Sequence, residues 1–116
     1  MKPTAARLDQ PFTLSPGASV VFDAESLQLD FVQVASDSRC PRGAQCITEG
    51  EATVRVSLSK SARAREERDL KTNPAASEAV YDAYRITLVM LEPYPAVDRP
   101  IRPSDYVATM LVTRSR

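Results

Sequence analysis

Apolar and polar residues alternate along most of this chain, with the period of two that indicates β-strands. The clearest example covers residues 52–58, where one face of the expected strand is apolar and the other polar. Turn residues separate this stretch from six other short segments of the same kind, at residues 12–14, 18–22, 27–34, 70–72, 84–91 and 105–113. The pattern predicts an all-β protein: an immunoglobulin-like β-sandwich of about seven strands with one short helical turn at most.

Details of the pattern predict how individual segments behave. Ser15, Pro16 and Gly17 suit a type II turn, after which residues 18–22 are expected to return as a strand. The alternation slips by one residue after Phe31, which indicates a β-bulge or a strand that bends between two sheets. Residues 84–91 are apolar on both faces near their end, as expected for a central strand with Val89 and Leu91 on the face opposite Leu88.

Three connections have distinctive composition. Residues 61–69 are dense in both charge signs and are expected to form a solvated loop or hairpin tip, with a single helical turn as the alternative. Asn73 and Pro74 suit the start of a short helix, as cap and first helical residue. Residues 93–104 contain four prolines, which exclude regular ladder pairing and predict a long connection before the last strand.

Length and charge limit the organisation and the partners. The 116 residues suit one domain, which we place at residues 11–116 after a flexible N-terminal segment of residues 1–10. Fifteen basic and fifteen acidic residues give no net charge, so we expect no nucleic-acid partner. No run of roughly 18 apolar residues is present, so we expect no membrane span. We expect a monomer or weak dimer whose partner, if any, is an envelope protein.

The chain contains no histidine, which removes the usual base of nucleophilic catalysis and a frequent metal ligand. We therefore predict no cofactor, no metal site and no catalytic residues. An alternative enzyme would use a pair of carboxylates drawn from Asp23, Asp30, Asp37 and Asp82, or thiol chemistry at the two cysteines.

The two cysteines, Cys40 and Cys46, enclose five residues between strand-like flanks. A structural disulfide is the favoured interpretation; closing such a ring stabilises a fold by roughly 2 kcal/mol in the loop-entropy model. Pro41 and Gly43 suit a tight turn inside the ring. The alternatives are a metal site, a redox-active pair and two free thiols, although redox pairs usually have two intervening residues and zinc sites need four ligands. A disulfide would place the protein in an oxidising compartment.

Four residues at this loop form a candidate recognition site: Asp37, Ser38, Arg39 and Arg42. In a structural interpretation, Asp37 accepts backbone hydrogen bonds and Arg39 pairs with a carboxylate. In a functional interpretation, the loop presents Arg39 and Arg42 to an anionic partner.

The chain also resembles a known family. The residues concerned are the Asp-Ser-Arg-Cys-Pro string at 37–41, then Cys46 and Gly50, the Tyr-x-Ile-x-Leu strand at 84–88 and the Leu-x-Pro-Tyr-Pro string at 91–95. Together they resemble small exported bacterial proteins, often lipoproteins, of uncharacterised function. The resemblance covers roughly residues 12–112 and implies export and a β-sandwich, but no activity.

One departure from that family lies after the second cysteine. The family usually has an aromatic residue there, commonly tryptophan, and then a small residue before the glycine. This chain instead has Ile47, Thr48 and Glu49. If the aromatic side chain contacts a partner in the family, this protein lacks that contact.

From these observations we expect a non-enzymatic binding or accessory module that is periplasmic, exposed on the cell surface or secreted. The basic residues 1–7 lack a following apolar core, so an exported protein would have a leader that is absent from this sequence. The alternatives are a thiol-redox or carboxylate enzyme, and a protease inhibitor that presents Arg39 or Arg42 on the Cys40–Cys46 loop.

Overall fold

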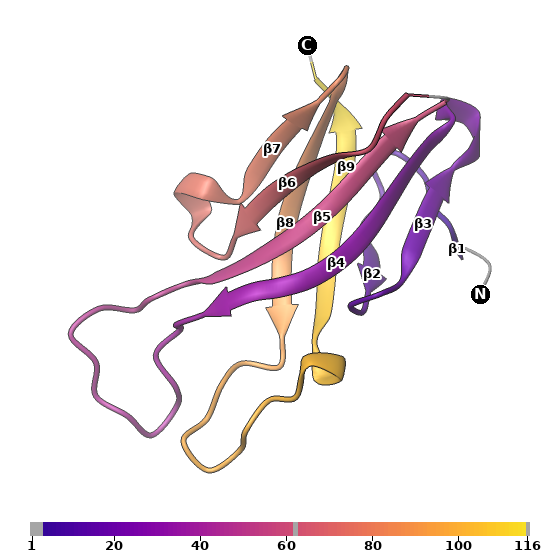
Figure 1. Cartoon of the computed structure of the whole chain (residues 1–116). Helices are drawn as coiled ribbons and strands as arrows, with labels where there is room; N and C mark the ends of the chain where they lie inside the picture. Colours follow the sequence, from indigo (N-terminus) through magenta and orange to yellow (C-terminus); the bar gives the residue numbers. More distant parts are fainter. Residues whose placement is uncertain (1–3, 62, 116) are drawn as a thin grey trace.

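A computed structural model describes residues 4–61 and 63–115 and confirms the all-β sandwich (Figure 1). Nine strands form a five-stranded sheet, in the order β1-β3-β4-β5-β6, and a four-stranded sheet, in the order β2-β9-β8-β7. The strands are β1 (Thr4–Ala5), β2 (Phe12–Leu14), β3 (Ser19–Phe22), β4 (Leu27–Asp37), β5 (Ala52–Lys60), β6 (Glu66–Lys71), β7 (Glu78–Tyr81), β8 (Tyr84–Glu92) and β9 (Val107–Arg114). Three single 3₁₀ turns, rather than one helical turn at most, join them: η1 (Asp23–Glu25), η2 (Pro74–Ala76) and η3 (Pro103–Asp105).

Neighbouring strands in each sheet are mostly consecutive in the chain: β3 to β6 in one sheet, and β7 to β9 in the other. The likeness to immunoglobulin domains therefore lies in the two-layer architecture rather than in the strand order. The helical segments are all one turn long, and no helix in residues 4–61 or 63–115 has the length and apolarity needed to cross a membrane.

The core lies between the sheets and is built from the apolar face of each strand. Its largest fully buried side chains include Phe22, Leu29, Phe31, Leu58, Tyr84, Ile86 and Met110. In the last predicted strand, residues 105–113, alternation implies a buried face of Tyr106, Ala108, Met110 and Val112, and all four residues are buried. Alternation therefore identified the core correctly in β9, because each side chain of the inner face points at the opposite sheet.

The turn at Ser15, Pro16 and Gly17 is present, but it changes sheets instead of forming a hairpin. Gly17 has φ +90°, and the Ala18 amide donates to the Ser15 carbonyl at 3.0 Å. β2 pairs with β9, whereas β3 pairs with β4 in the other sheet. The strand predicted at residues 18–22 is therefore present as β3, but it lies in the opposite layer from β2, and both strands bury apolar side chains in the one core.

β4 and β5 form the long central pair of the five-stranded sheet. Their register shifts between Phe31 and Gln33, which confirms the bulge indicated by the sequence. The outward face of β5 is less exposed than the alternation suggested: Thr53 and Ser57 are buried. Long side chains cover these positions, because the Lys71 ammonium donates to the Thr53 hydroxyl at 3.2 Å and Arg65 reaches Ser57 at 3.4 Å.

The charged run expected to be a loop instead contributes most of β6, the edge strand of the five-stranded sheet. Leu70 is its one fully buried residue, and its charged side chains discourage edge-to-edge pairing with other chains. The turn after β6 follows the prediction: the Asn73 side chain accepts from the Ala75 amide at 3.0 Å and caps η2.

β8 lies between β7 and β9, as predicted for a central strand, but a register shift between Leu88 and Met90 changes its later residues. Val89 and Met90 are 52% and 49% exposed, whereas Leu91 is buried. The prediction that Val89 and Leu91 share a face is therefore wrong. A bulge inserts one residue and reverses the phase of the side chains beyond it.

Several residues of the N-terminal segment contact the sandwich. Thr4–Ala5 pair in parallel with β3, and the Asp9 amide donates to the Val112 carbonyl at 2.9 Å. Ala6 and Leu8 pack against the core. Residues 1–3 lie outside the described part of the chain.

Candidate functional site

Two long connections leave the sandwich at the same end (Figure 1). Residues 38–51 join β4 to β5, and residues 93–102 follow β8; we term these two segments the loop pair. They are joined directly, because the Arg42 amide donates to the Pro95 carbonyl at 2.9 Å and the Val97 amide donates to the Arg42 carbonyl at 3.1 Å. The loop pair is therefore one hydrogen-bonded unit rather than two independent loops.

A disulfide closes the first loop, as the sequence predicted. Cys40 and Cys46 are bonded, with Cα atoms 5.9 Å apart. Below the ring, the Cys40 amide donates to the Glu49 carbonyl and the Ser38 amide to the Glu51 carbonyl, both at 2.8 Å. The ring thus stands on a short ladder that continues the β4–β5 pair.

Ser38 and Gly50 fit tightly together in this ladder. The Ser38 hydroxyl donates to the Glu51 carbonyl at 2.9 Å and accepts from the Glu51 amide at 3.1 Å. Gly50 has φ +68°, and a Cβ atom there would lie 1.8 Å from the Ser38 carbonyl oxygen. Of the four candidate recognition residues, Ser38 therefore has a structural role in these contacts, and Gly50 is required by the close approach of the two backbones.

Asp37 and Arg39 form a two-pronged ion pair at the base of the loop pair. Arg39 Nε lies 2.8 Å from Asp37 Oδ1, and Arg39 Nη2 lies 2.7 Å from Oδ2. The Arg39 backbone amide also donates to Asp37 Oδ1 at 3.2 Å. This geometry matches the structural interpretation of both residues, because paired N–H groups of a guanidinium fit a carboxylate.

Arg39 extends the network across to the other sheet. Its Nη1 donates to the Leu91 carbonyl at 2.9 Å, and its Nη2 donates to the Pro93 carbonyl at 3.1 Å. The hydroxyl of Tyr106, the residue just before β9, donates to Asp37 Oδ2 at 2.9 Å. Arg39 is only 7% exposed, so the expectation that it is presented to an anionic partner is wrong. Its guanidinium N–H groups bind acceptors within the protein.

The network shifts the ionisation of its members. Burial alone would raise the pKa of Asp37, but hydrogen bonds from Arg39 and Tyr106 outweigh it and hold that pKa below its usual value. Burial would lower the pKa of Arg39, but the Asp37 carboxylate raises it above its usual value. Burial and the hydrogen bond to Asp37 raise the pKa of Tyr106 to about 12. At neutral pH Asp37 is therefore ionised, Arg39 is positively charged and Tyr106 keeps its hydroxyl proton.

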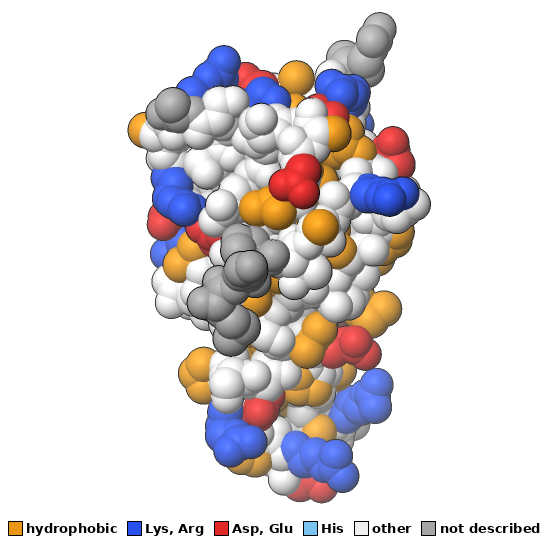
Figure 2. All heavy atoms as spheres, turned by 90° about the vertical axis from the view of Figure 1, so that its right-hand side faces the viewer, with side chains coloured by type: hydrophobic (Ala, Val, Ile, Leu, Met, Phe, Trp, Pro, Cys, Tyr) orange, Lys and Arg blue, Asp and Glu red, His pale blue; other side chains and the backbone are white. Residues whose placement is uncertain are grey.

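The outer end of the loop pair carries exposed apolar and aromatic side chains. Ile47 is fully exposed, Val97 is 64% exposed and Tyr94 is 46% exposed. The Arg42 guanidinium lies 5.5 Å from the centroid of the Tyr94 ring, and that of Arg39 lies 5.3 Å from it. We term Arg42, Ile47, Tyr94 and Val97 the tip. The narrow lower end of the molecule in Figure 2 carries hydrophobic, basic and acidic side chains.

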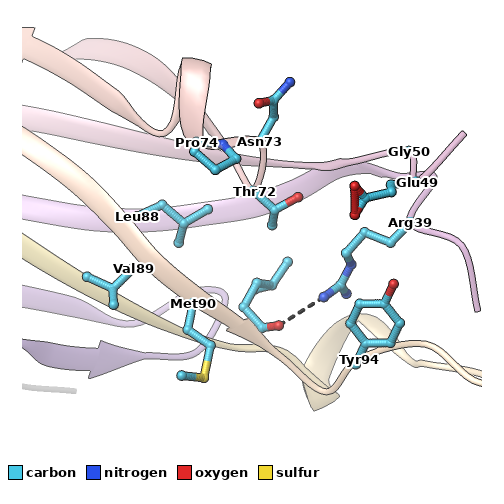
Figure 3. A pocket seen from close by; sticks show the side chains of 11 residues that line it. Arg39, Glu49, Gly50, Thr72, Asn73, Pro74, Leu88, Val89, Met90 and Tyr94 are labelled. Atoms are coloured by element: carbon cyan, nitrogen blue, oxygen red, sulfur yellow. Dashed lines mark hydrogen bonds between the residues drawn. The ribbon is translucent and has the colours of Figure 1, made fainter. Parts of the chain in front are cut away.

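A groove of about 520 Å³ opens beside the loop pair (Figure 3). One wall is the end of β8, from Leu88 to Leu91. The other wall is the β6–η2 connection, residues 72–74. Arg39, Glu49, Gly50 and Tyr94 line the end nearest the loop pair. The Leu91 carbonyl bonded by Arg39 lies at this end, so the ion-pair network also shapes the groove.

The residues of the alternative enzyme hypotheses do not converge. Asp30, Asp37 and Asp82 each pair with a different arginine, namely Arg65, Arg39 and Arg63. Within residues 4–61 and 63–115, no three histidine, cysteine or acidic side chains gather where they could hold a metal ion. These three carboxylates thus occupy separate ion pairs.

The inhibitor hypothesis also meets a structural obstacle. Arg39 is buried, and both the amide and the carbonyl of Arg42 are bonded within the loop pair. A protease would have to compete with those bonds to engage the backbone of Arg42. The Arg42 side chain, in contrast, is exposed and free to meet a partner surface.

Sequence reasoning identified Asp37 and Arg39 but missed three of their partners. These are the hydroxyl of Tyr106 and the carbonyls of Leu91 and Pro93, more than fifty residues later in the chain. Because every residue has a backbone carbonyl, residue type does not reveal which carbonyls will accept these hydrogen bonds. The alternation at residues 105–113 indicated only a buried position for Tyr106, and not the hydrogen bond of its hydroxyl to Asp37.

The comparisons with known proteins found no counterpart. No protein-family model matches this chain, and neither a curated protein nor a solved structure matches it significantly.

Proposed function

We propose that this protein is a non-enzymatic binding or accessory module that recognises a partner protein through the tip. The module acts at the cell envelope or after secretion, in the periplasm or at the cell surface. The single observation that carries the proposal is the combination of a strongly braced loop pair with large apolar side chains left at its outer end.

The composition of the tip suits protein recognition. Aromatic residues and arginine are enriched at the centres of protein interfaces, where they contribute most of the binding energy. The Arg42 guanidinium lies over the Tyr94 ring, and Ile47, in the same loop as Arg42, is 103% exposed and gains no burial within its own chain. Docking against a partner would remove this apolar surface from water.

Bracing of the loop pair favours the same conclusion. The disulfide, the backbone bonds of Arg42 and the Arg39 network hold the tip before any partner arrives. A surface that is already ordered loses little conformational freedom on binding, so more of the contact energy appears as affinity. The disulfide itself supports an oxidising compartment, since such bonds persist there.

Site-specific photocrosslinking tests the proposal. A photoreactive phenylalanine analogue replaces Ile47 in the protein in its native cells, and Val32, 39% exposed on β4, is the matched control position. We expect one discrete crosslinked partner from position 47 and none from position 32. Arg42→Glu should remove that product. Identical products from both positions, or none from position 47, would contradict recognition through the tip.

A further inference from the structure

The edge of β8 is paired along only part of its length. β7 pairs with β8 from Tyr81–Tyr84 to Glu78–Thr87, and the Leu88 amide donates to the Ser77 carbonyl at 2.8 Å. β8 continues to Glu92 and remains paired with β9 on its other side. Among the residues that the structure describes, no strand pairs with residues 89–92 on the β7 side.

This open edge borders the groove. Leu88, Val89, Met90 and Leu91 form one wall, and residues 72–74, which follow β6, face them (Figure 3). A volume of about 520 Å³ lies within the usual range of roughly 300–1,000 Å³ for ligand sites. Backbone groups along an unpaired edge are a template for a further strand.

We propose that the groove binds an extended peptide segment with alternating apolar and basic side chains, which adds to β8 as a strand. Main-chain hydrogen bonds supply affinity in this mode of recognition, and pockets for alternate side chains supply specificity. Apolar side chains of the segment pack against Val89 and Met90, which are about half exposed. The groove shares Tyr94 with the tip, but the added strand binds at β8, so this inference does not depend on the proposed function.

Charge selects the basic side chains of the segment. Two charged residues line the groove, Arg39 and Glu49. The Arg39 charge is already matched by Asp37, whereas Glu49 has no ion pair among the described residues. The groove therefore presents an uncompensated carboxylate, and a lysine or arginine of the incoming segment is its complement.

Arg39 also limits how far the added strand extends. It occupies the carbonyl of Leu91, and Pro93 follows two residues later. The stretch without a strand partner, residues 89–92, is about four residues or roughly 13 Å long, and the Leu91 carbonyl within it is not available to the added segment. A short segment fits this space, whereas continuous pairing past residue 92 does not.

Amide chemical shifts of the ¹⁵N-labelled protein test the proposal. The probes are a blocked hexapeptide that alternates valine with lysine, its glutamate counterpart, and the lysine peptide with N-methylated valines. We expect the lysine peptide to shift the amides of residues 49–50 and 88–92 and to bind about tenfold more tightly than the glutamate peptide. A second methylated version of the lysine peptide carries N-methylated lysines instead of valines. The version whose methylated amides would face the β8 edge should not bind, because it has lost the N–H donors for the added strand.

Variants separate this site from other surfaces. Val89→Ser should weaken binding of the lysine peptide about threefold or more, whereas Val80→Ser should not. Val80 is the matched control, because it is 50% exposed and lies on β7 in the same sheet. Glu49→Gln should abolish the preference for lysine over glutamate.

Three results would overturn the proposal: no shifts at residues 88–92 at millimolar peptide, equal affinity for the two charged peptides, or undiminished binding of both N-methylated versions. The variants Arg42→Glu and Ile47→Ser distinguish this proposal from that for the tip. They should leave peptide binding unchanged and remove only the crosslinked partner.

Discussion

The Nη1 atom of Arg39 donates a hydrogen bond of 2.9 Å to the backbone carbonyl of Leu91, 52 positions later in the chain. This contact joins the residues that follow β4, in one sheet, to the end of β8, in the other. Asp37 holds the guanidinium from one side, and Tyr106 holds Asp37. One buried arginine therefore connects both sheets and both members of the loop pair.

Replacing Arg39 by alanine should destabilise the protein strongly. The change leaves the Asp37 carboxylate without its ion partner and two carbonyls without their donor, and loss of one member of a buried pair costs about 3–5 kcal/mol. Arg39→Lys should recover only part of this, because an ammonium cannot reproduce the two-pronged geometry. Chemical denaturation measures the free energy of unfolding for each variant.

Arg42→Ala is the matched control for that experiment. Arg42 lies in the same loop but is exposed, so its loss should change the free energy of unfolding by less than about 1 kcal/mol. Equal effects of Arg39→Ala and Arg42→Ala would contradict the structural role assigned to Arg39.

Gly50→Ala should be far more disruptive than Gly17→Ala, although both glycines have positive φ. At Gly17 a methyl group meets nothing within 4 Å, so only the left-handed backbone costs energy, about 1–2 kcal/mol. At Gly50 the same methyl group would overlap the Ser38 carbonyl, adding an overpacking cost of roughly 1–3 kcal/mol or more. Thermal unfolding of the two variants tests this order; a smaller loss for Gly50→Ala would refute it.

Removing the disulfide should lower the free energy of unfolding by roughly 2 kcal/mol, since the closed ring of Cys40 to Cys46 is short. We expect Cys40→Ser combined with Cys46→Ser to remain folded, because the core lies between the sheets and not in the loop. The double variant and the reduced wild type should agree in denaturant midpoint. A fully unfolded double variant would show that the ring does more than brace the loop pair.

The sequence predicted the parts of this structure that depend on local chemistry. Alternation located most of the strands, the slip after Phe31 indicated a real bulge, and Asn73 caps a helical turn as expected. Spacing and composition also indicated the disulfide between Cys40 and Cys46. Each of these signals lies within a few neighbouring residues.

Features that depend on distant partners were missed. The bulge at Leu88 to Met90 exposes Val89, although nothing in the apolar run 88–91 marks it. The charged residues of β6 form a strand because their backbone pairs with β5, not because of their own β-propensity. For the same reason Arg39 was expected to meet a partner, since its acceptors, the carbonyls of Leu91 and Pro93, belong to another part of the chain.

Acid should weaken the network through Asp37. The pKa of Asp37 is lower in the folded protein than its usual value of about 3.9, so its ionised form stabilises the fold. That contribution is complete above pH ~4 and is lost as pH falls through the folded pKa. Denaturant unfolding at several pH values should show wild type losing its advantage over Asp37→Asn as the pH falls below about 4.

Alkali should weaken the same network through Tyr106, with the opposite sign. Its pKa rises to about 12 in the folded protein, so the protonated hydroxyl stabilises the fold. This contribution is complete below the usual tyrosine value of about 10 and is lost as pH rises toward 12. Tyr106→Phe should lack that part of the decline and start from a lower free energy of unfolding, because Asp37 loses a donor. An alkaline profile of Tyr106→Phe parallel to that of wild type would show that Tyr106 titrates independently of folding.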